Sequence, residues 1–262
     1  MSLSNKRVVV TGSASGIGEA TVALLREKGA TVIGLDRKER TDNVDEFHRV
    51  ELTDFSSIDN AINEVSGPIH GLCNIAGIPP RPNNAPLVLM VNFVALRRLT
   101  TTIVPKLSDG ASIANVASIA GFGWQQNTER VKKGLALSDD ADLETFCKEN
   151  DIGYPNSYPF SKECVIAWTK QSNRRWADRG IRSNSVSPGP VETPILEEFV
   201  TAFGEKARKD IERVGRAGRP EDIAPVIAFL LDDESRWIRG TNIAVDGGIE
   251  GIFFENMLHF DG

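Results

Sequence analysis

Thr11-Gly12-Ser13-Ala14-Ser15-Gly16-Ile17-Gly18 is the stretch that decides the fold. It follows a short β-branched run over residues 7–11 and precedes a helix-like pattern over residues 17–28, so its glycines lie in a strand-to-helix turn. The first glycine permits a tight turn, the second lets the backbone approach a pyrophosphate, and the third lets the helix pack close to the strand. Free N–H groups at the helix N-terminus favour an anion. The stretch therefore predicts a dinucleotide-binding unit.

Outward from this turn, short apolar runs alternate with longer amphipathic segments along the chain. Such alternation is typical of a parallel sheet with helices on both faces. We predict one Rossmann-type, doubly wound α/β domain over residues 1–262, with about seven strands. The predicted strands occupy residues 7–11, 31–35, 71–74, 111–116, 181–186 and 242–245, with a weaker one near Val50. The predicted helices occupy residues 17–28, 55–65, 87–107, 158–179 and 220–231.

Three segments depart from this pattern. Residues 122–157 are polar and charged, and we predict a helical insertion there. Residues 194–219 are helical in character between proline-rich turns, and we predict a lid over the substrate. Trp124 is a candidate for the wall of the substrate pocket. The terminal apolar run is expected to pack against a neighbouring subunit or to close the substrate cleft, and it comprises Ile252, Phe253, Phe254, Met257, Leu258 and Phe260.

Composition narrows the class of function. Lys and Arg number 30 against 36 Asp and Glu, which gives a net charge of −6, and 40% of the residues are hydrophobic. We expect no nucleic-acid partner, because the chain lacks a basic footprint. No stretch that we recognise in the sequence approaches the ~20 apolar residues of a membrane span, so we expect a cytoplasmic protein. Cys73, Cys147 and Cys164 are expected to be buried thiols, and the scattered histidines give no metal site.

Asp36 ends the second predicted strand, 24 positions after Gly12. A carboxylate at this point can accept hydrogen bonds from both ribose hydroxyls of an adenosine and repels a 2′-phosphate. Arg37 follows directly and could pair with a phosphate, but Ser13 brings no second cation from the glycine turn. The sequence therefore predicts NAD rather than NADP.

Tyr158 and Lys162 carry the next chemical signal. Residues four apart share a helix face, so the phenol and the ammonium can point into one site. An ammonium near a phenol lowers a pKa that is normally ~10, which makes Tyr158 a usable acid or base. Pro159 is compatible with the first turn of a helix. Taken alone, the pair also suits an exposed helix face, so its meaning depends on the other motifs.

Further motifs occur in a fixed order along the chain. They are the glycine turn at residues 11–18, Asn74-Ile75-Ala76-Gly77, Asn92, Ser118, Tyr158 with Lys162, Pro188-Gly189 with Thr193, and Asp246-Gly247-Gly248. With these motifs the chain resembles a member of the short-chain dehydrogenase/reductase family over nearly its whole length.

The resemblance implies an oxidoreductase with four catalytic residues. Tyr158 would exchange a proton with the substrate oxygen while nicotinamide exchanges hydride with the carbon, and Ser118 would hydrogen-bond that oxygen. Lys162 would lower the pKa of Tyr158 and hold the nicotinamide ribose, and Asn92 would anchor a water that relays protons. The implied cofactor-binding residues are Gly12, Ser15, Gly16, Ile17, Gly18, Asp36, Arg37, Glu51, Leu52, Asn74, Ala76, Gly77, Tyr158, Lys162, Pro188, Gly189, Val191 and Thr193. Glu51 stands where the family often has Asp.

Spacing narrows the resemblance to one branch. Ser118 and Tyr158 are 40 positions apart, which is longer than is usual in the family, and the stretch from Asn74 to Asn92 is short. Both features resemble the bacterial 3α-hydroxysteroid dehydrogenase/carbonyl reductases and coniferyl-alcohol dehydrogenases. The insertion in that branch covers helix faces through which many relatives dimerise. A homodimer or homotetramer with a different interface is therefore implied.

These observations predict an NAD-dependent alcohol dehydrogenase/carbonyl reductase for a hydrophobic substrate that is aromatic, allylic, or cyclic and steroid-like. One alternative is a catalytically silent NAD-binding regulator on the same fold, since fold alone does not fix function. Another is a methyltransferase that uses the glycine turn for its cofactor. The methyltransferase leaves Ser118, Tyr158 and Lys162 unexplained, and silent relatives usually lose the tyrosine or the lysine. The identity of the substrate, the reaction direction and the oligomer size stay open.

Overall fold

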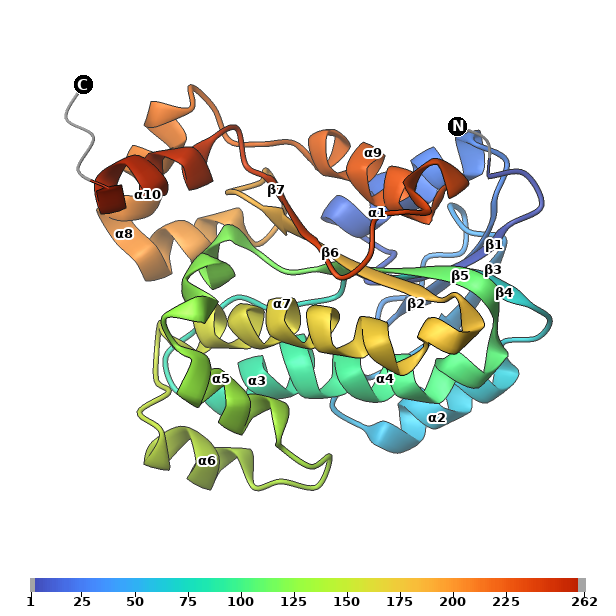
Figure 1. Ribbon diagram of the computed structural model, residues 1–262, viewed down its shortest axis with the longest axis horizontal. Helices are drawn as coiled ribbons and strands as arrows, with labels where there is room; N and C mark the ends of the chain where they lie inside the picture. The colour runs from blue at the N-terminus through green and yellow to red at the C-terminus, as the bar shows by residue number, and fades with distance from the viewer. Residues whose placement is uncertain (1–2, 259–262) are drawn as a thin grey trace.

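A parallel sheet organises the computed structural model, which describes residues 3–258 (Figure 1). Within these residues the sheet has seven strands in the order β3-β2-β1-β4-β5-β6-β7. The strand order reverses at β1: the chain adds β2 and β3 on one side of it and β4 to β7 on the other. In open α/β sheets, ligands bind at such a reversal. The predicted Rossmann-type fold is confirmed. The strands are β1 (Arg7–Thr11), β2 (Thr31–Asp36), β3 (Glu46–Arg49), β4 (Ile69–Asn74), β5 (Leu107–Val116), β6 (Arg182–Pro188) and β7 (Asn242–Val245).

Helices cover both faces of the sheet, because its central strands are apolar on both sides (Figure 1). One face is covered by α1 (Gly16–Glu27) and α9 (Pro220–Leu231), which pack against each other. The other face is covered by α2 (Phe55–Glu64), α4 (Ala95–Ile103) and α7 (Ser157–Arg175). The predicted helix over residues 17–28 ends as expected, because Gly29 adopts a φ of +86°.

The prediction of one regular helix over residues 87–107 is wrong. The chain instead forms α3 (Ala85–Leu89), a π turn η1 (Met90–Val94), α4 and a 3-10 turn η2 (Val104–Lys106), and β5 already begins at Leu107. The composite helix Ala85–Lys106 is also long and apolar enough to cross a membrane, contrary to the prediction that no stretch approaches that length. However, 67% of its most apolar window is buried within the protein, as in a core helix.

Two further helical segments were predicted outside the regular pattern, and both are helical in the structure. The predicted insertion contains α5 (Thr128–Leu135) and α6 (Leu143–Glu149), which follow the 3-10 segment η3 (Ile119–Gln125) and pack against α7 and α3. The segment predicted as a lid forms α8 (Leu196–Arg213), which kinks at Gly204. Near it lies α10 (Ile249–Leu258), and both helices occupy one end of the molecule (Figure 1). Phe260 lies outside the described residues.

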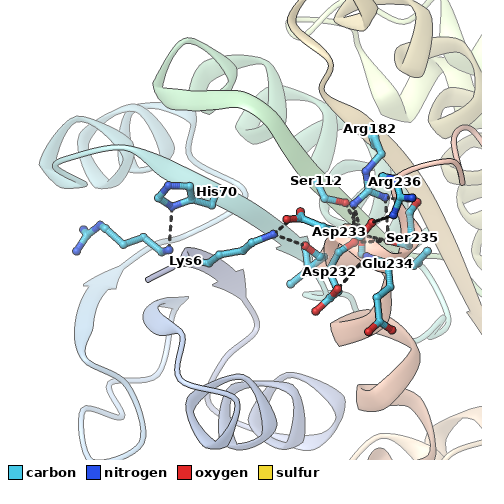
Figure 2. A network of polar contacts seen from close by, with 12 residues as sticks. Lys6, His70, Ser112, Arg182, Asp232, Asp233, Glu234, Ser235 and Arg236 are labelled. Atoms are coloured by element: carbon cyan, nitrogen blue, oxygen red, sulfur yellow. Dashed lines mark hydrogen bonds and ion pairs between the residues drawn. The ribbon is translucent and has the colours of Figure 1, made fainter. Parts of the chain in front are cut away.

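A buried arginine fixes the end of α9 to the sheet (Figure 2). The Arg182 guanidinium on β6 donates to the backbone oxygens of Leu230 (3.0 Å), Asp232 (3.2 Å) and Ser235 (3.0 Å). The Ser112 hydroxyl on β5 also donates to the Leu230 oxygen, at 2.6 Å. These donors satisfy carbonyl groups at the C-terminal end of α9 and in the 3-10 turn that follows it (Asp233–Ser235). Burial lowers the pKa of Arg182, and its carbonyl partners stabilise it without a carboxylate hydrogen bond.

Candidate active site

The glycine turn after β1 has no room for side chains. Gly12 and Gly16 have φ values of +70° and +55°. A Cβ on Gly12 would lie 2.9 Å from the Ala76 backbone nitrogen, and one on Gly18 would lie 1.9 Å from the Gly12 oxygen. A Cβ on Gly16 would meet the Thr193 side chain at 3.0 Å. The bare backbone at the N-terminus of α1 therefore fits a pyrophosphate, and the Thr193 side chain lies beside it.

Asp36 lies beside this turn at the end of β2. One carboxylate oxygen accepts a hydrogen bond from the Ala14 N–H at 3.1 Å, and the other accepts one from the Lys38 N–H at 2.9 Å. Arg37, Glu51 and Leu52 line the same part of the cavity. The structure thus brings together the residues predicted to hold the adenosine end of a dinucleotide, and they fit it chemically.

A cavity of about 740 Å³ extends from the glycine turn to α8. All of the predicted cofactor-binding residues line it except Asn74. The Asn74 amide is buried in the sheet, where it donates to the Thr100 hydroxyl (2.9 Å) and to the Asn115 side-chain oxygen (2.8 Å). Here its side chain links β4 to α4 and β5 instead of facing the cavity.

Three of the predicted catalytic side chains meet at the other half of the cavity. Ser118 follows β5, while Tyr158 and Lys162 occupy the first two turns of α7. The Ser118 and Tyr158 side chains hydrogen-bond to each other. The Lys162 ammonium lies 5.6 Å from the centre of the Tyr158 ring and donates to the Val116 carbonyl oxygen at 2.9 Å. The spacing argument for Tyr158 and Lys162 therefore agrees with the geometry.

The pKa values differ from the expectation for this pair. Burial raises the pKa of Tyr158 to about 12, and the hydrogen bond with Ser118 acts in the opposite direction. Burial lowers the pKa of Lys162 to about 8. Removal from water favours the neutral form of each group, and for Tyr158 this effect exceeds the expected influence of the neighbouring ammonium. At pH 7 the phenol is protonated and the ammonium is still mainly charged.

Asn92 lies in the π turn η1, behind the cavity wall. Its side-chain oxygen accepts from the Ile78 N–H at 2.8 Å, and its amide nitrogen donates to the Ile78 oxygen (3.1 Å) and to the Ser161 hydroxyl (3.3 Å). A Cβ on Gly77 would lie within 3.6 Å of both the Asn92 oxygen and the Lys162 ammonium, so these groups approach each other there. The contacts hold the loop after β4 against α7, and the water relay stays a prediction.

Aromatic residues form the outer wall of this half, and of these the sequence singled out only Phe253. The ring centre of Phe199 lies 4.6 Å from that of Tyr158, and Phe203 stacks beyond it at 6.3 Å. Phe122 and Phe253 also line the cavity, with ring centres 6.0 Å apart. Trp124 was wrongly expected at this wall, since it packs instead into the core around α7. The apolar tail was predicted either to contact a neighbouring subunit or to close the substrate cleft. Because Phe253 lines the cavity, the structure favours closure of the cleft.

Comparison with known proteins agrees with this geometry. The short chain dehydrogenase family model matches residues 6–129, and the model described as enoyl-(acyl carrier protein) reductase matches residues 143–250. A coniferyl-alcohol dehydrogenase of Pseudomonas sp. strain HR199 is 39% identical over 255 residues, which cover 97% of this chain and 100% of the relative. The chain belongs to the short-chain dehydrogenase/reductase family.

Two further relatives place this short-chain dehydrogenase/reductase in the predicted branch. It is 26% identical to the 3-alpha-hydroxysteroid dehydrogenase/carbonyl reductase of Comamonas testosteroni, over 94% of this chain and 96% of the relative. The crystal structure of the 3-alpha-hydroxysteroid dehydrogenase from Pseudomonas sp. B-0831 complexed with NADH matches with a TM-score of 0.83 and 30% identity, covering 95% and 98% of the two chains. The protein is therefore an oxidoreductase that uses a nicotinamide cofactor.

Proposed function

We propose that this enzyme is an NAD-dependent alcohol dehydrogenase/carbonyl reductase that acts on a hydrophobic alcohol or carbonyl, either aromatic, allylic, or cyclic and steroid-like. The observation that carries the proposal is the meeting of Ser118, Tyr158 and Lys162 beside an aromatic wall. Because the Phe199 ring touches the Tyr158 ring, a substrate whose oxygen reaches the phenol must place its carbon skeleton against apolar surface.

The chemistry divides among the residues of the site. A bound nicotinamide ring accepts or donates the hydride. Tyr158 donates its phenolic proton to the carbonyl oxygen during reduction and receives one from the alcohol during oxidation. Ser118 hydrogen-bonds to the same oxygen and fixes its direction. The mainly charged Lys162 favours the phenolate that reduction leaves behind.

Direct replacement of the phenol tests this function, and the chain offers a matched control. Tyr158→Phe is expected to lower kcat by at least about a hundredfold on a panel of alcohols with NAD, while NADH still binds. Tyr154, the chain's other tyrosine, is 40% exposed, so Tyr154→Phe is expected to keep wild-type turnover. Near-wild-type activity of Tyr158→Phe would refute the mechanism. A wild-type protein that binds NADH and turns over nothing would favour the silent regulator.

We also infer that NAD is preferred over NADP. The inference is supported by the Asp36 carboxylate at the adenosine end of the cavity, where it would repel a 2′-phosphate. Lys38 lines this end as well, and it supplies only its backbone N–H to Asp36. Asp36→Ser is expected to lower kcat/KM with NAD and to raise the relative activity with NADP at least about tenfold, which is roughly one lost charge interaction. An unchanged ratio of the two activities argues against this role.

Assembly and location remain part of the proposal. We expect a homodimer or homotetramer whose interface lies elsewhere than on α7 and α3, because α5 and α6 of the insertion pack against these helices. A small-molecule substrate in the cytoplasm, with no nucleic-acid partner, stays our expectation.

A further inference from the structure

Helix α8 covers the substrate half of the cavity, and its burial pattern is unusual. All eighteen of its residues are described, and only one of them, Asp210, is buried. Asp210 is 7% exposed. A carboxylate is costly to bury unless donors or cations compensate it, so a buried carboxylate on a covering helix calls for a partner.

The protein itself supplies little to this carboxylate. An Arg213 guanidinium nitrogen lies 3.9 Å from one Asp210 oxygen, which is an ion pair beyond hydrogen-bond distance. Among residues 3–258 we find no hydrogen-bond donor to the Asp210 side chain. An ionised carboxylate can accept about four hydrogen bonds, so Asp210 keeps accepting capacity that a ligand could use.

Asp210 lines the cavity from the part of α8 that follows the kink at Gly204. It lines both the main cavity and an adjoining one of about 530 Å³, as do Lys206 and Phe253. Lys206 is one helical turn before Asp210, and its ammonium lies 5.3 Å from the centre of the Phe253 ring. From Tyr158, the aromatic wall of Phe199 and Phe203 therefore leads along α8 to one acidic and one basic side chain. We call Lys206 and Asp210 the distal pair.

We propose that the substrate carries a hydroxyl group at the end remote from the reacting carbon, and that Asp210 accepts a hydrogen bond from it. This inference rests on the proposed dehydrogenase function and names its substrate more narrowly. The distal pair selects the group by its chemistry. Asp210 repels an anion, and Lys206 repels a cation. A hydroxyl can donate to the carboxylate and accept from the ammonium, whereas an apolar end leaves both unpaired.

Matched alcohols that differ only in a distal hydroxyl test the proposal. One short pair is cinnamyl alcohol and 4-hydroxycinnamyl alcohol, and one longer pair is biphenyl-4-ylmethanol and its 4′-hydroxy derivative. The wild-type enzyme is expected to prefer the hydroxylated member of at least one pair by about tenfold or more in kcat/KM, since a hydrogen bond to a charged group has this magnitude. Asp210→Leu is expected to reduce that ratio to near one.

Glu212 provides the control, because it is an exposed carboxylate on the same helix and lines neither cavity. Glu212→Leu is expected to leave the ratio unchanged. Equal turnover of both members in each pair by the wild type overturns the distal-hydroxyl proposal and leaves the dehydrogenase function standing. The same conclusion follows if Asp210→Leu loses kcat/KM equally on both members of a pair, or if the wild type prefers 4′-amino or 4′-carboxy analogues. If the wild-type enzyme turns over neither these alcohols nor the wider panel of alcohols, with either NAD or NADP, both proposals are overturned.

Discussion

The contact between Gly18 and the Gly12 carbonyl allows a quantitative prediction for Gly18→Ala. The added Cβ would lie 1.9 Å from the Gly12 oxygen and 2.7 Å from its carbon, whereas Cβ atoms in proteins essentially never approach other heavy atoms within 3.0 Å. The two backbones would have to separate by about 1.1 Å. No side-chain rotation can relieve the overlap, because both partners are backbone. The N-terminus of α1 must therefore move away from the glycine turn.

The sign of the effect follows from two opposing terms. Alanine is favoured over glycine inside a helix by up to ~1 kcal/mol, and Gly18 lies in the first turn, where the gain is smaller. Overpacking typically costs about 1–3 kcal/mol, and a clash between two backbone segments belongs at the upper end. We expect a net loss of about 2 kcal/mol in the free energy of unfolding. Because the N–H groups of α1 shift with it, we also expect NADH to bind at least about tenfold more weakly.

Urea unfolding and NADH fluorescence titration, both at 25 °C, measure these two effects. Gly251→Ala is the matched control, because Gly251 also lies in a helix and its added Cβ would have no atom within 4 Å. That variant is expected to be at least as stable as the wild type and to bind NADH equally well. If Gly18→Ala has the same stability and NADH affinity as Gly251→Ala, the reasoning about this turn is refuted.

Two further predictions concern charge. Because burial lowers the pKa of Lys162 to about 8 from the ordinary 10.5, the unfolded chain binds more protons between these values, and stability rises with pH there. Between pH 8 and 10 the free energy of unfolding of the wild type, measured with urea, is expected to rise relative to that of Lys162→Met by up to about 3 kcal/mol. Parallel pH profiles of the two proteins would contradict the burial of a charged lysine. Arg81, in the loop after β4, donates to the Glu198 carboxylate on α8 and is 62% exposed. In steady-state kinetics, Arg81→Ala is expected to raise KM by less than about fivefold at low salt and to have no effect in 1 M NaCl. A larger change, or one that does not depend on salt, contradicts a simple surface ion pair.

Local patterns predicted the sheet well and irregular backbone poorly. Apolar β-branched runs between glycines locate β1, β2 and β7 almost to the residue. The sequence does not predict the start of β5, because residues 108–110 are Ser, Asp and Gly, the last two of them exposed, and do not resemble a buried strand. The π turn at residues 90–94 adds a residue to a helical turn, and the sequence does not mark it, because all of its residues except Asn92 are apolar. It is held by contacts from Asn92 to Ile78, and contacts between distant segments cannot be seen in periodicity.

The two halves of the site were predictable to different degrees for a topological reason. Parallel strands bring their carboxyl ends to one edge, so Gly12, Asp36 and Ser118 meet there whatever the side chains around them. Asn74 occupies a similar strand end, yet its side chain turns into the sheet toward Asn115. No strand fixes Phe199 or Asp210. Their positions depend on how α8 packs across the cavity, and the sequence shows only that α8 is helical.

Tyr158 and Lys162 show what a motif leaves undetermined even when it is right. Their spacing predicts that the two side chains meet, and they do. It cannot predict the balance between charge attraction and loss of water, because that balance depends on what covers the pair. Phe199 against the Tyr158 ring and the burial of both groups favour the neutral phenol and the neutral amine together. The protonated phenol is the form that reduction of a carbonyl requires. The apolar surroundings that form the substrate wall therefore also keep Tyr158 protonated, as a proton donor, at neutral pH. Oxidation of an alcohol first requires the phenol to lose this proton.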